Sequence, residues 1–451
     1  MNHNHSRYQA RLDFINGIDG LLKTTFDLPA NTQVEPIAYD PESPFKYNNF
    51  VYRISLPSPL DKENSTCQKL PGCVAIPPGT SALILRLTNP DATSMGSPNR
   101  VENEVAIMTL AAAALNPNFE PHVVPRVYGW AGTRSNKGEP QQGWILQEFM
   151  PGIPLDEELD KMNLEGKKEI FTQIAKLLKG LQDFPLPASI TKFGGLTFDN
   201  ENNIISAQMT TTDDTGPWPS YEAAFEARLK QALIKSDENP YIRGWRENGV
   251  RDRLEAFIER GLAESFQRLG SPGEKAIIHA DLTPNNLLFD ITSGRITGLI
   301  DYDFSCVMHP SYEFLCSFNS GFGGKFAGWP GIEARDARAL RKAKLYGFPD
   351  PLPGDRQDGK GVQWKVAKIW ENTLQNEGCK RPMTISGIEV VADVDALLGT
   401  ILPWRVTNSD ILRRQTDGVI RNCRDENEKI LIEILEHLGV LVLARIEYAE
   451  A

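Results

Sequence analysis

One stretch of the sequence, residues 276–303, concentrates the side chains that could do chemistry. Asp281 follows a short apolar run, Asn286 comes five residues later, and Asp301 ends the next apolar run. A carboxylate fixed at a strand end can accept a proton from a hydroxyl, and carboxylate and amide oxygens are ligands that Mg²⁺ prefers. Transfer of a phosphoryl group to a hydroxyl uses both functions, because its catalysis consists mostly of positioning and charge stabilisation.

A β-hairpin is predicted within this stretch. The apolar runs NLLF and ITGLI are separated by turn residues at 292–295, a pattern that favours two antiparallel strands. The hairpin would return Asp301 beside Asn286, so that both could hold one magnesium ion. Asp281, in a loop restrained by Pro284, is the candidate proton acceptor. The alternative is a polar turn that only caps two strands.

A buried ion pair is predicted in the N-terminal half. The three leucines of SALILRLT (81–88) share one face of a strand by their period of two, which leaves Arg86 on the other face. In the predicted helix 100–115, Glu104 falls inside the apolar stripe, where an unpaired carboxylate would be costly. We therefore predict that Arg86 pairs with Glu104. The alternative is an exposed arginine and an ordinary helix glutamate.

The segment HADLTPNN and the later IDYDF resemble the catalytic loop and the metal-binding segment of the aminoglycoside phosphotransferase and choline kinase superfamily. Protein kinases carry a related pair of motifs. The resemblance implies that Asp281 is the catalytic base, that Asn286 and Asp301 bind Mg²⁺, and that His279 orders the loop. FGGLTFD and TGPWPSYEAAF look like segments of fungal phosphotransferase-family proteins.

The same resemblance extends to the nucleotide site. Arg86 and Glu104 would correspond to the β3 cation and the αC glutamate of kinases, and an arginine fork can hold phosphates.

The loop SPFKYNNFVYRI resembles the superfamily's nucleotide loop. Asn48 and Asn49 can reach left-handed backbone angles there and leave amides free for phosphates; a plain hairpin turn is the alternative. The run WILQEFMPG looks like the hinge, where backbone groups of Glu148 and Met150 could meet adenine; an edge strand is the alternative.

The acceptor site is predicted between the catalytic hairpin and the helical insert and tail of the C-lobe. The acceptor must bring its hydroxyl to Asp281 while the nucleotide approaches from the N-terminal lobe. Asp213, Asp214, Trp218 and Asp303 are the candidates, because they could present carboxylates and an aromatic face to a cationic group. The alternative is a solvated acidic loop with Trp218 in the core.

The fold class that follows is α+β, a bilobal protein-kinase-like fold. Residues 1–150 would form a small N-lobe with an antiparallel sheet and one helix, and the hinge would lie at 148–152. Residues 151–451 would form a larger, mainly helical C-lobe that carries the catalytic loop and β-hairpin (279–303) and a C-terminal helical extension (361–451). Strands are expected over 50–56, 81–88 and 144–149.

Composition narrows the functional class. The chain has 451 residues, of which 41% are hydrophobic and 24% charged, as in ordinary globular proteins. A net charge of −11 and the absence of Lys/Arg-rich runs argue against nucleic-acid binding. The sequence shows neither a signal segment nor an apolar run long enough to span a membrane, so we expect a cytoplasmic protein with reduced cysteines and no membrane association.

The sequence therefore predicts a kinase that uses ATP and Mg²⁺ to phosphorylate a hydroxyl of a small molecule, and a cationic substrate would suit the acidic charge balance. One alternative is a nucleotide-binding pseudokinase with weak turnover. Another is nucleotidyl transfer or carboxylate activation on the same fold. The sequence leaves open which acceptor is used, whether ATP or GTP is preferred, and the oligomeric state.

Overall fold

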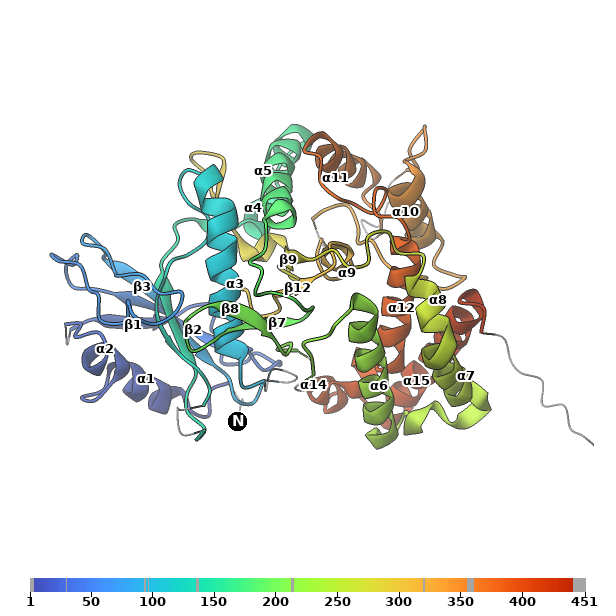
Figure 1. The fold of residues 1–451 in the computed structure, drawn as a ribbon, viewed down its shortest axis with the longest axis horizontal. Helices are drawn as coiled ribbons and strands as arrows, with labels where there is room; N and C mark the ends of the chain where they lie inside the picture. The colour runs from blue at the N-terminus through green and yellow to red at the C-terminus, as the bar shows by residue number, and fades with distance from the viewer. Residues whose placement is uncertain are drawn as a thin grey trace, which may run out of the picture. The chain divides into compact units, whose positions relative to one another are not determined.

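The computed structural model describes residues 4–29, 31–92, 95, 97–134, 138–211, 215–318, 321–354 and 361–440. The chain divides into two compact units. The first comprises residues 1–219, 275–321 and 372–379, and the second comprises residues 220–274, 322–371 and 380–451. Figure 1 shows the elements of both.

A five-stranded antiparallel sheet forms the N-terminal part of the first unit. Its order is β1 (Gln33–Pro36), β2 (Asn49–Ser55), β3 (Ala82–Thr88), β5 (Trp144–Glu148) and β4 (Val127–Ala131). The three leucines of β3 are fully buried and pack in one core with residues of and near the helices α1 (Tyr8–Asn16) and α2 (Leu21–Thr24). This face of the sheet is therefore the apolar one, as the alternation in β3 predicts.

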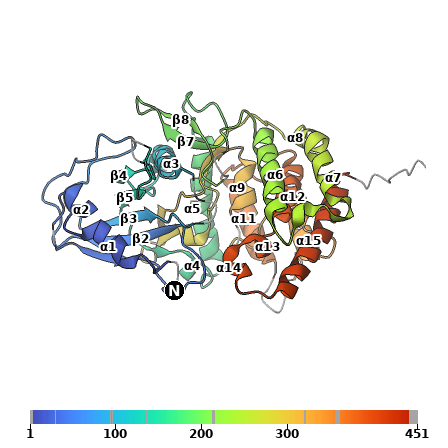
Figure 2. The same ribbon diagram turned by 90° about the horizontal axis from the view of Figure 1, so that it is seen from below.

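Helix α3 (Arg100–Leu115) lies on the opposite side of the sheet from α1 (Figure 2) and has the predicted bounds. It is buried on nearly all sides rather than along one stripe, since it packs against β7 (Gly195–Phe198), α5 (Leu164–Asp183), β4 and β9 (Ala276–Ile278). Polar groups inside this contact are paired. Asn103, for example, accepts a hydrogen bond from the backbone N–H of Leu196 (2.7 Å) and donates one to the carbonyl of Ser305 (3.0 Å).

The remaining strands of the first unit form three small sheets. β10 (Leu287–Asp290) pairs with β11 (Arg295–Leu299) and with β6 (Ile153–Pro154), β9 (Ala276–Ile278) pairs with β12 (Cys306–Met308), and β7 (Gly195–Phe198) pairs with β8 (Ile204–Ala207). The antiparallel β10–β11 pair is the predicted hairpin. Helices α4 (Asp156–Leu159), α5 (Leu164–Asp183) and α9 (Ser311–Cys316) complete this part.

The second unit is helical. Its helices are α6 (Tyr221–Glu238), α7 (Val250–Ala256), α8 (Leu262–Phe266), α10 (Arg335–Tyr346), α12 (Ile388–Ile401), α13 (Trp404–Thr407), α14 (Ser409–Leu412) and α15 (Asp417–His437). Helix α12 packs against α15, α6 and α8, which its buried valines and leucines explain. Residues of α11 (Trp364–Asn376) are divided between the units.

The predicted α+β class is confirmed. The two compact units divide the chain at other positions than the predicted lobes, and the lobe boundary at 148–152 stays a prediction. Within the described ranges, no helix combines the length and the apolarity needed to cross a bilayer. The six cysteines, which all lie among the described residues, form no disulfide with one another.

Candidate active site

A cavity of about 530 Å³ lies in the first unit between the five-stranded sheet and the β10–β11 hairpin. Its walls come from the loop before β2, from β2, β3 and β5, from residues 149–154, from β10 and from residues 300–303. Seven of the residues singled out in the sequence line this cavity: Asn48, Asn49, Arg86, Glu148, Met150, Asp301 and Asp303.

The catalytic loop is held by Glu313 of α9. Its carboxylate accepts hydrogen bonds from the backbone N–H groups of His279 (2.7 Å) and Ala280 (3.1 Å), and from the hydroxyl of Ser317. Burial raises the pKa of Glu313 to about 7, although these three donors oppose the rise. Ala280 has a left-handed backbone (φ 63°), an uncommon conformation for alanine that turns the chain immediately before Asp281.

His279 joins the catalytic loop to the segment after β11. Its ring is fully buried, and Nε2 donates to the carbonyl oxygen of Ile300 (3.1 Å), because a carbonyl can only accept. The ring also packs against Tyr302, with centroids 4.8 Å apart. Burial lowers the pKa of His279 to about 4, so the imidazole is neutral at physiological pH. This position suits the loop-ordering role that the resemblance implies, which stays a prediction.

Asp281 and Asn286 are in direct contact. The Asn286 side-chain amide donates to Asp281 Oδ2 (2.8 Å) and to the Asp281 carbonyl (2.9 Å). Both partners are acceptors, so the amide NH₂ must face Asp281 and the amide oxygen must point elsewhere. That oxygen receives only a long bond from Asn285 (3.3 Å). Partial burial raises the pKa of Asp281, and the bond from Asn286 opposes the rise.

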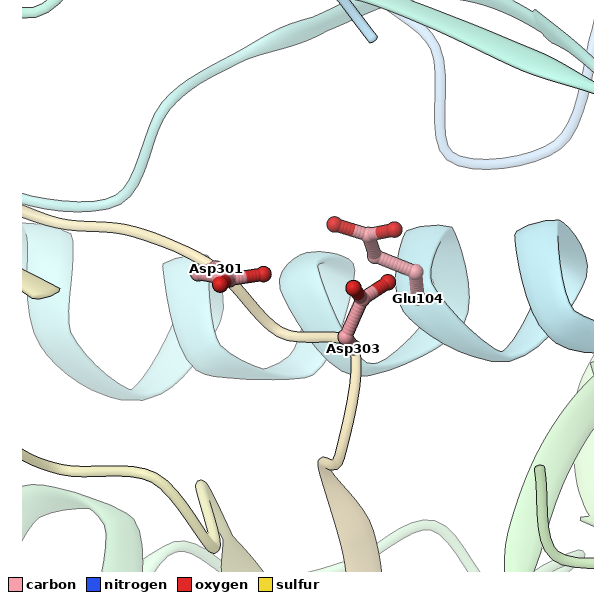
Figure 3. A group of neighbouring side chains, drawn as sticks. All are labelled: Glu104, Asp301 and Asp303. Atoms are coloured by element: carbon pink, nitrogen blue, oxygen red, sulfur yellow. The ribbon is translucent and has the colours of Figure 1, made fainter. Parts of the chain in front are cut away.

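The hairpin brings Asp301 back to this region, because the N–H of Ile300 donates to the carbonyl of Asn286 (3.0 Å). Carboxylate oxygens of Asp301, Asp303 and Glu104 lie within 4.8 Å of one another. Figure 3 shows Glu104 projecting from α3 toward the two aspartates of the segment after β11. The Asp301 backbone is left-handed (φ 66°).

Arg86 lies among these carboxylates. Nη1 pairs with Glu104, as predicted, and Nη2 lies 2.8 Å from Asp301 and 3.5 Å from Asp303. Desolvation raises the pKa of Glu104 to about 8, and Arg86 opposes the rise. Desolvation would lower the pKa of Arg86, but the three carboxylates outweigh it and raise the pKa above its ordinary value. Arg86 therefore stays charged.

The sequence analysis missed Arg100, the first residue of α3. Its Nη2 lies 3.2 Å from Asp303 and also donates to Asn49 Oδ1 (3.0 Å) and to the carbonyl of Asn48 (2.9 Å). Burial would raise the pKa of Asp303, but Arg100 and Arg86 outweigh it and lower the pKa. The signal for Arg100 was its position one turn before Glu104, on the same helix face.

The loop asparagines differ from the expectation. Neither Asn48 nor Asn49 has a left-handed backbone, and the Asn49 amide is engaged by Asp303 (2.7 Å) rather than free. Both line the cavity. The loop joins β1 to β2, because β1 precedes the strand that the sequence analysis took as the first.

The predicted hinge residues also line the cavity. The Glu148 carboxylate pairs with His122 (2.8 Å), and its N–H donates to Arg126. The N–H of Met150 has no partner among the described residues. A backbone hydrogen-bond donor is therefore available where the nucleotide base is predicted to bind.

The structure describes two of the four candidate residues of the acceptor site, Trp218 and Asp303. Asp213 and Asp214 lie outside the described residues. Trp218 is 6% exposed and forms a bridge with Phe193, which favours its alternative as a core residue. Asp303 is buried against Arg100 and lines the cavity beside Arg86. A contact of any of them with the acceptor stays a prediction.

Comparisons with known proteins bear on the identity of the chain. Among solved structures, an ethanolamine kinase of Plasmodium vivax is 14% identical, with a TM-score of 0.43 over 93% of this chain and 88% of that one. A streptomycin–ATP–APH(2'')-IIa ternary complex is 11% identical, with a TM-score of 0.49 over 96% and 99%. An ADP-bound aminoglycoside phosphotransferase APH(2'')-Ib is 12% identical, with a TM-score of 0.45 over 92% and 97%.

A search of curated protein sequences found no significant match. The family model of the phosphotransferase enzyme family matches residues 76–347, which is more than half of the chain and contains both motifs. The resemblance of these motifs is thereby confirmed, and the chain belongs to the phosphotransferase enzyme family.

Proposed function

We propose that this protein transfers the γ-phosphoryl group of a nucleoside triphosphate to a hydroxyl of a small molecule. The observation that carries the proposal is the direct contact of Asn286 with Asp281, next to a cavity that contains Arg86 and Asp301. In this proposal a proton acceptor, a pair of oxygen ligands and a phosphate-binding cation would meet in one place, as phosphoryl transfer requires.

Asn286 and Asp301 are the proposed ligands of Mg²⁺. The donor set fits the ion, because Asn286 turns its amide oxygen away from Asp281 and the side chain of Asp301 is 36% exposed toward the cavity. When bound, Mg²⁺ would neutralise charge on the phosphate chain and orient it. The left-handed backbone of Asp301 aims this carboxylate, and the hairpin fixes its distance from Asn286.

Asp281 is the proposed catalytic base. Its raised pKa makes the carboxylate a better proton acceptor than an exposed aspartate. Glu313 and His279 would hold the loop so that the carboxylate does not move during the reaction. Arg86, oriented by Glu104, would contact the phosphates.

The nucleotide base would lie at the other end of the cavity, between apolar side chains of β2, β3 and β10. The N–H of Met150 would donate to it. The acceptor would be a small molecule that brings its hydroxyl to Asp281, and solved structures similar to this chain include an ethanolamine kinase and a complex with streptomycin. A cationic acceptor stays part of the proposal.

A nucleotide-binding protein without turnover is the second candidate. Arg86 Nη2 lies 2.8 Å from Asp301, so the arginine competes with Mg²⁺ for the same carboxylate. A protein that keeps this ion pair with nucleotide bound would bind the nucleotide without orienting its γ-phosphate.

The test is incubation with ATP or GTP, Mg²⁺ and a library of hydroxyl-bearing metabolites that includes amino alcohols and amino sugars. We expect a nucleoside diphosphate and an acceptor heavier by one phosphoryl group, both identified by mass spectrometry, and formation of both slowed by a factor on the order of 10² or more with Asp281→Asn. Release of AMP or pyrophosphate would contradict phosphoryl transfer. Nucleotide binding without any product would favour the second candidate.

A further inference from the structure

Gln147 of β5 is a buried amide without a partner. It is 5% exposed and lines the cavity of the proposed nucleotide site. Among the described residues, neither its side-chain oxygen nor its side-chain nitrogen has a hydrogen-bond partner. A buried amide without a partner is costly, and native proteins rarely leave one unpaired. An unpaired amide beside a cavity points to a ligand that would supply the missing hydrogen bonds.

The sheet register defines where this amide lies. Gln147 is directly opposite Ile84 of β3, and Arg86 is directly opposite Ile145. Residues 84 and 86 share one face of β3 because side chains alternate along a strand. Gln147 therefore lies on the sheet face that carries Arg86. Along β5, it is two residues closer to Met150 than Ile145, the residue opposite Arg86. Apolar side chains also line this cavity: Ile37, Val51, Ile84, Met150, Leu288 and Ile300.

We propose that Gln147 hydrogen-bonds the 6-substituent of a bound purine and accepts both an amino and an oxo group there. The inference rests on the proposed nucleotide site, because Arg86 would hold the phosphates and the apolar part of the cavity would hold a flat ring system. The amide oxygen accepts from an amino group and the amide nitrogen donates to an oxo group.

Gln147 would accept both an amino and an oxo group because none of the described residues fixes the orientation of its amide. Rotation of the side-chain amide by half a turn exchanges its donor and acceptor, and no described residue fixes either orientation. Adenine-type and hypoxanthine-type nucleotides therefore both satisfy it. A purine with hydrogen at position 6 leaves the buried amide unpaired, so it binds more weakly.

The experiment compares three ligands by calorimetry in the presence of Mg²⁺, which requires no acceptor. ATP carries a 6-amino group, inosine triphosphate a 6-oxo group, and purine riboside triphosphate a hydrogen. For the unaltered protein we expect Kd values within about 10-fold of each other for the first two, and binding weaker by about 10-fold or more for the third. Inosine triphosphate is preferred to GTP because it lacks the 2-amino group.

The variant Gln147→Leu keeps the volume and removes both hydrogen-bonding groups. It should bind the three triphosphates within about 3-fold of one another, since no group remains that distinguishes them. The matched control is Gln68→Leu in an exposed turn, which should keep the pattern of the unaltered protein. The ligand series on the unaltered protein tests the inference even where the variant does not fold.

Each remaining outcome overturns the inference in a distinguishable way. Equal binding of all three ligands by the unaltered protein would mean that water satisfies the amide. A preference of 100-fold or more between ATP and inosine triphosphate would mean that one amide orientation is fixed. In both cases the proposed nucleotide site would stand. Binding of none of the triphosphates would overturn the proposed function together with this inference.

Discussion

At the scale of single residues, one hydrogen bond couples the two proposed functions of the catalytic loop. By donating its amide NH₂ to Asp281, Asn286 both stabilises the ionised base and turns its own oxygen away for a metal. Sequence spacing placed the two residues in one loop. It did not define the amide orientation, because that depends on which acceptors face it in the folded chain.

Asp281→Asn should lower turnover by a factor on the order of 10² or more while leaving nucleotide affinity nearly unchanged. The substitution removes the proton acceptor but none of the proposed phosphate contacts. Steady-state kinetics with the identified acceptor, together with calorimetric titration of the nucleotide, measure the two quantities separately. Unaltered turnover would exclude Asp281 as the base.

The pH dependence of kcat/KM should report the same carboxylate. Asp281 must be ionised to accept a proton, and its pKa is raised, so the rate should fall on acidification at a pH above the ordinary range of aspartate. Asn286 opposes this rise, and Asn286→Ala should therefore move the acid limb to higher pH. A midpoint that is unchanged, or that moves to lower pH, would contradict the coupling.

At the scale of secondary-structure elements, buried side chains connect the strand, the helix and the hairpin that form the site. The Arg86–Glu104 pair joins β3 to α3, and each partner was recognisable because a charged residue interrupts an apolar pattern. The contact of Arg100 with Asp303 joins residues that are 203 positions apart, and Asn49 is 254 positions from Asp303. No local sequence pattern predicts a contact between residues so far apart in the chain.

A double-mutant cycle should detect the connection between β3 and α3. Arg86→Ala and Glu104→Ala should each weaken nucleotide binding, and the double variant should cost about 0.5–3 kcal/mol less than the sum. The free energy of nucleotide binding, from calorimetry, closes the cycle. The exposed pair Lys230–Glu226 of α6 is the control and should leave binding unchanged. Additive costs at Arg86 and Glu104 would mean that the two residues act independently.

Helix α9 should make the stability of the catalytic loop depend on pH. The folded-state pKa of Glu313 is about 7 against an ordinary value of 4.5, so the folded protein binds this proton more tightly than the unfolded chain. Its contribution to stability is full below about pH 4.5 and is lost as the pH rises through about 7.

The comparison of the unaltered protein with Glu313→Gln isolates this group. The Tm of the unaltered protein minus the Tm of Glu313→Gln should decrease between pH 5 and pH 7.5. Glu313 loses its proton over this range, whereas the glutamine does not titrate. A difference that is independent of pH would mean that Glu313 is ionised throughout this range and that its three donors outweigh burial.

At the scale of the whole molecule, the sequence predicted the class of fold and the motif-bearing hairpin better than the arrangement around them. Hydrophobic periodicity identified α3 and three strands of the five-stranded sheet (β2, β3 and β5), since these elements bury one face or more, but it did not identify β4. It missed β1, whose residues are exposed or half-buried and therefore lack an apolar pattern. Because β1 was missed, the loop at Asn48 was placed before the sheet rather than between its first two strands.

Ligand binding should stabilise the folded chain through Asp301. A nucleotide with Mg²⁺ at 100 times its Kd adds about 2.7 kcal/mol to the free energy of unfolding, and part of this requires the metal. Asp301→Ala also removes a partner of Arg86 and so changes the Tm of the free protein.

The quantity to compare is therefore the rise in Tm on adding nucleotide, measured once with Mg²⁺ and once with a chelator. The unaltered protein and the exposed control Asp252→Ala should show a larger rise with Mg²⁺, whereas Asp301→Ala should show the same rise in both conditions. A persistent magnesium-dependent rise in Asp301→Ala would assign the metal to other side chains.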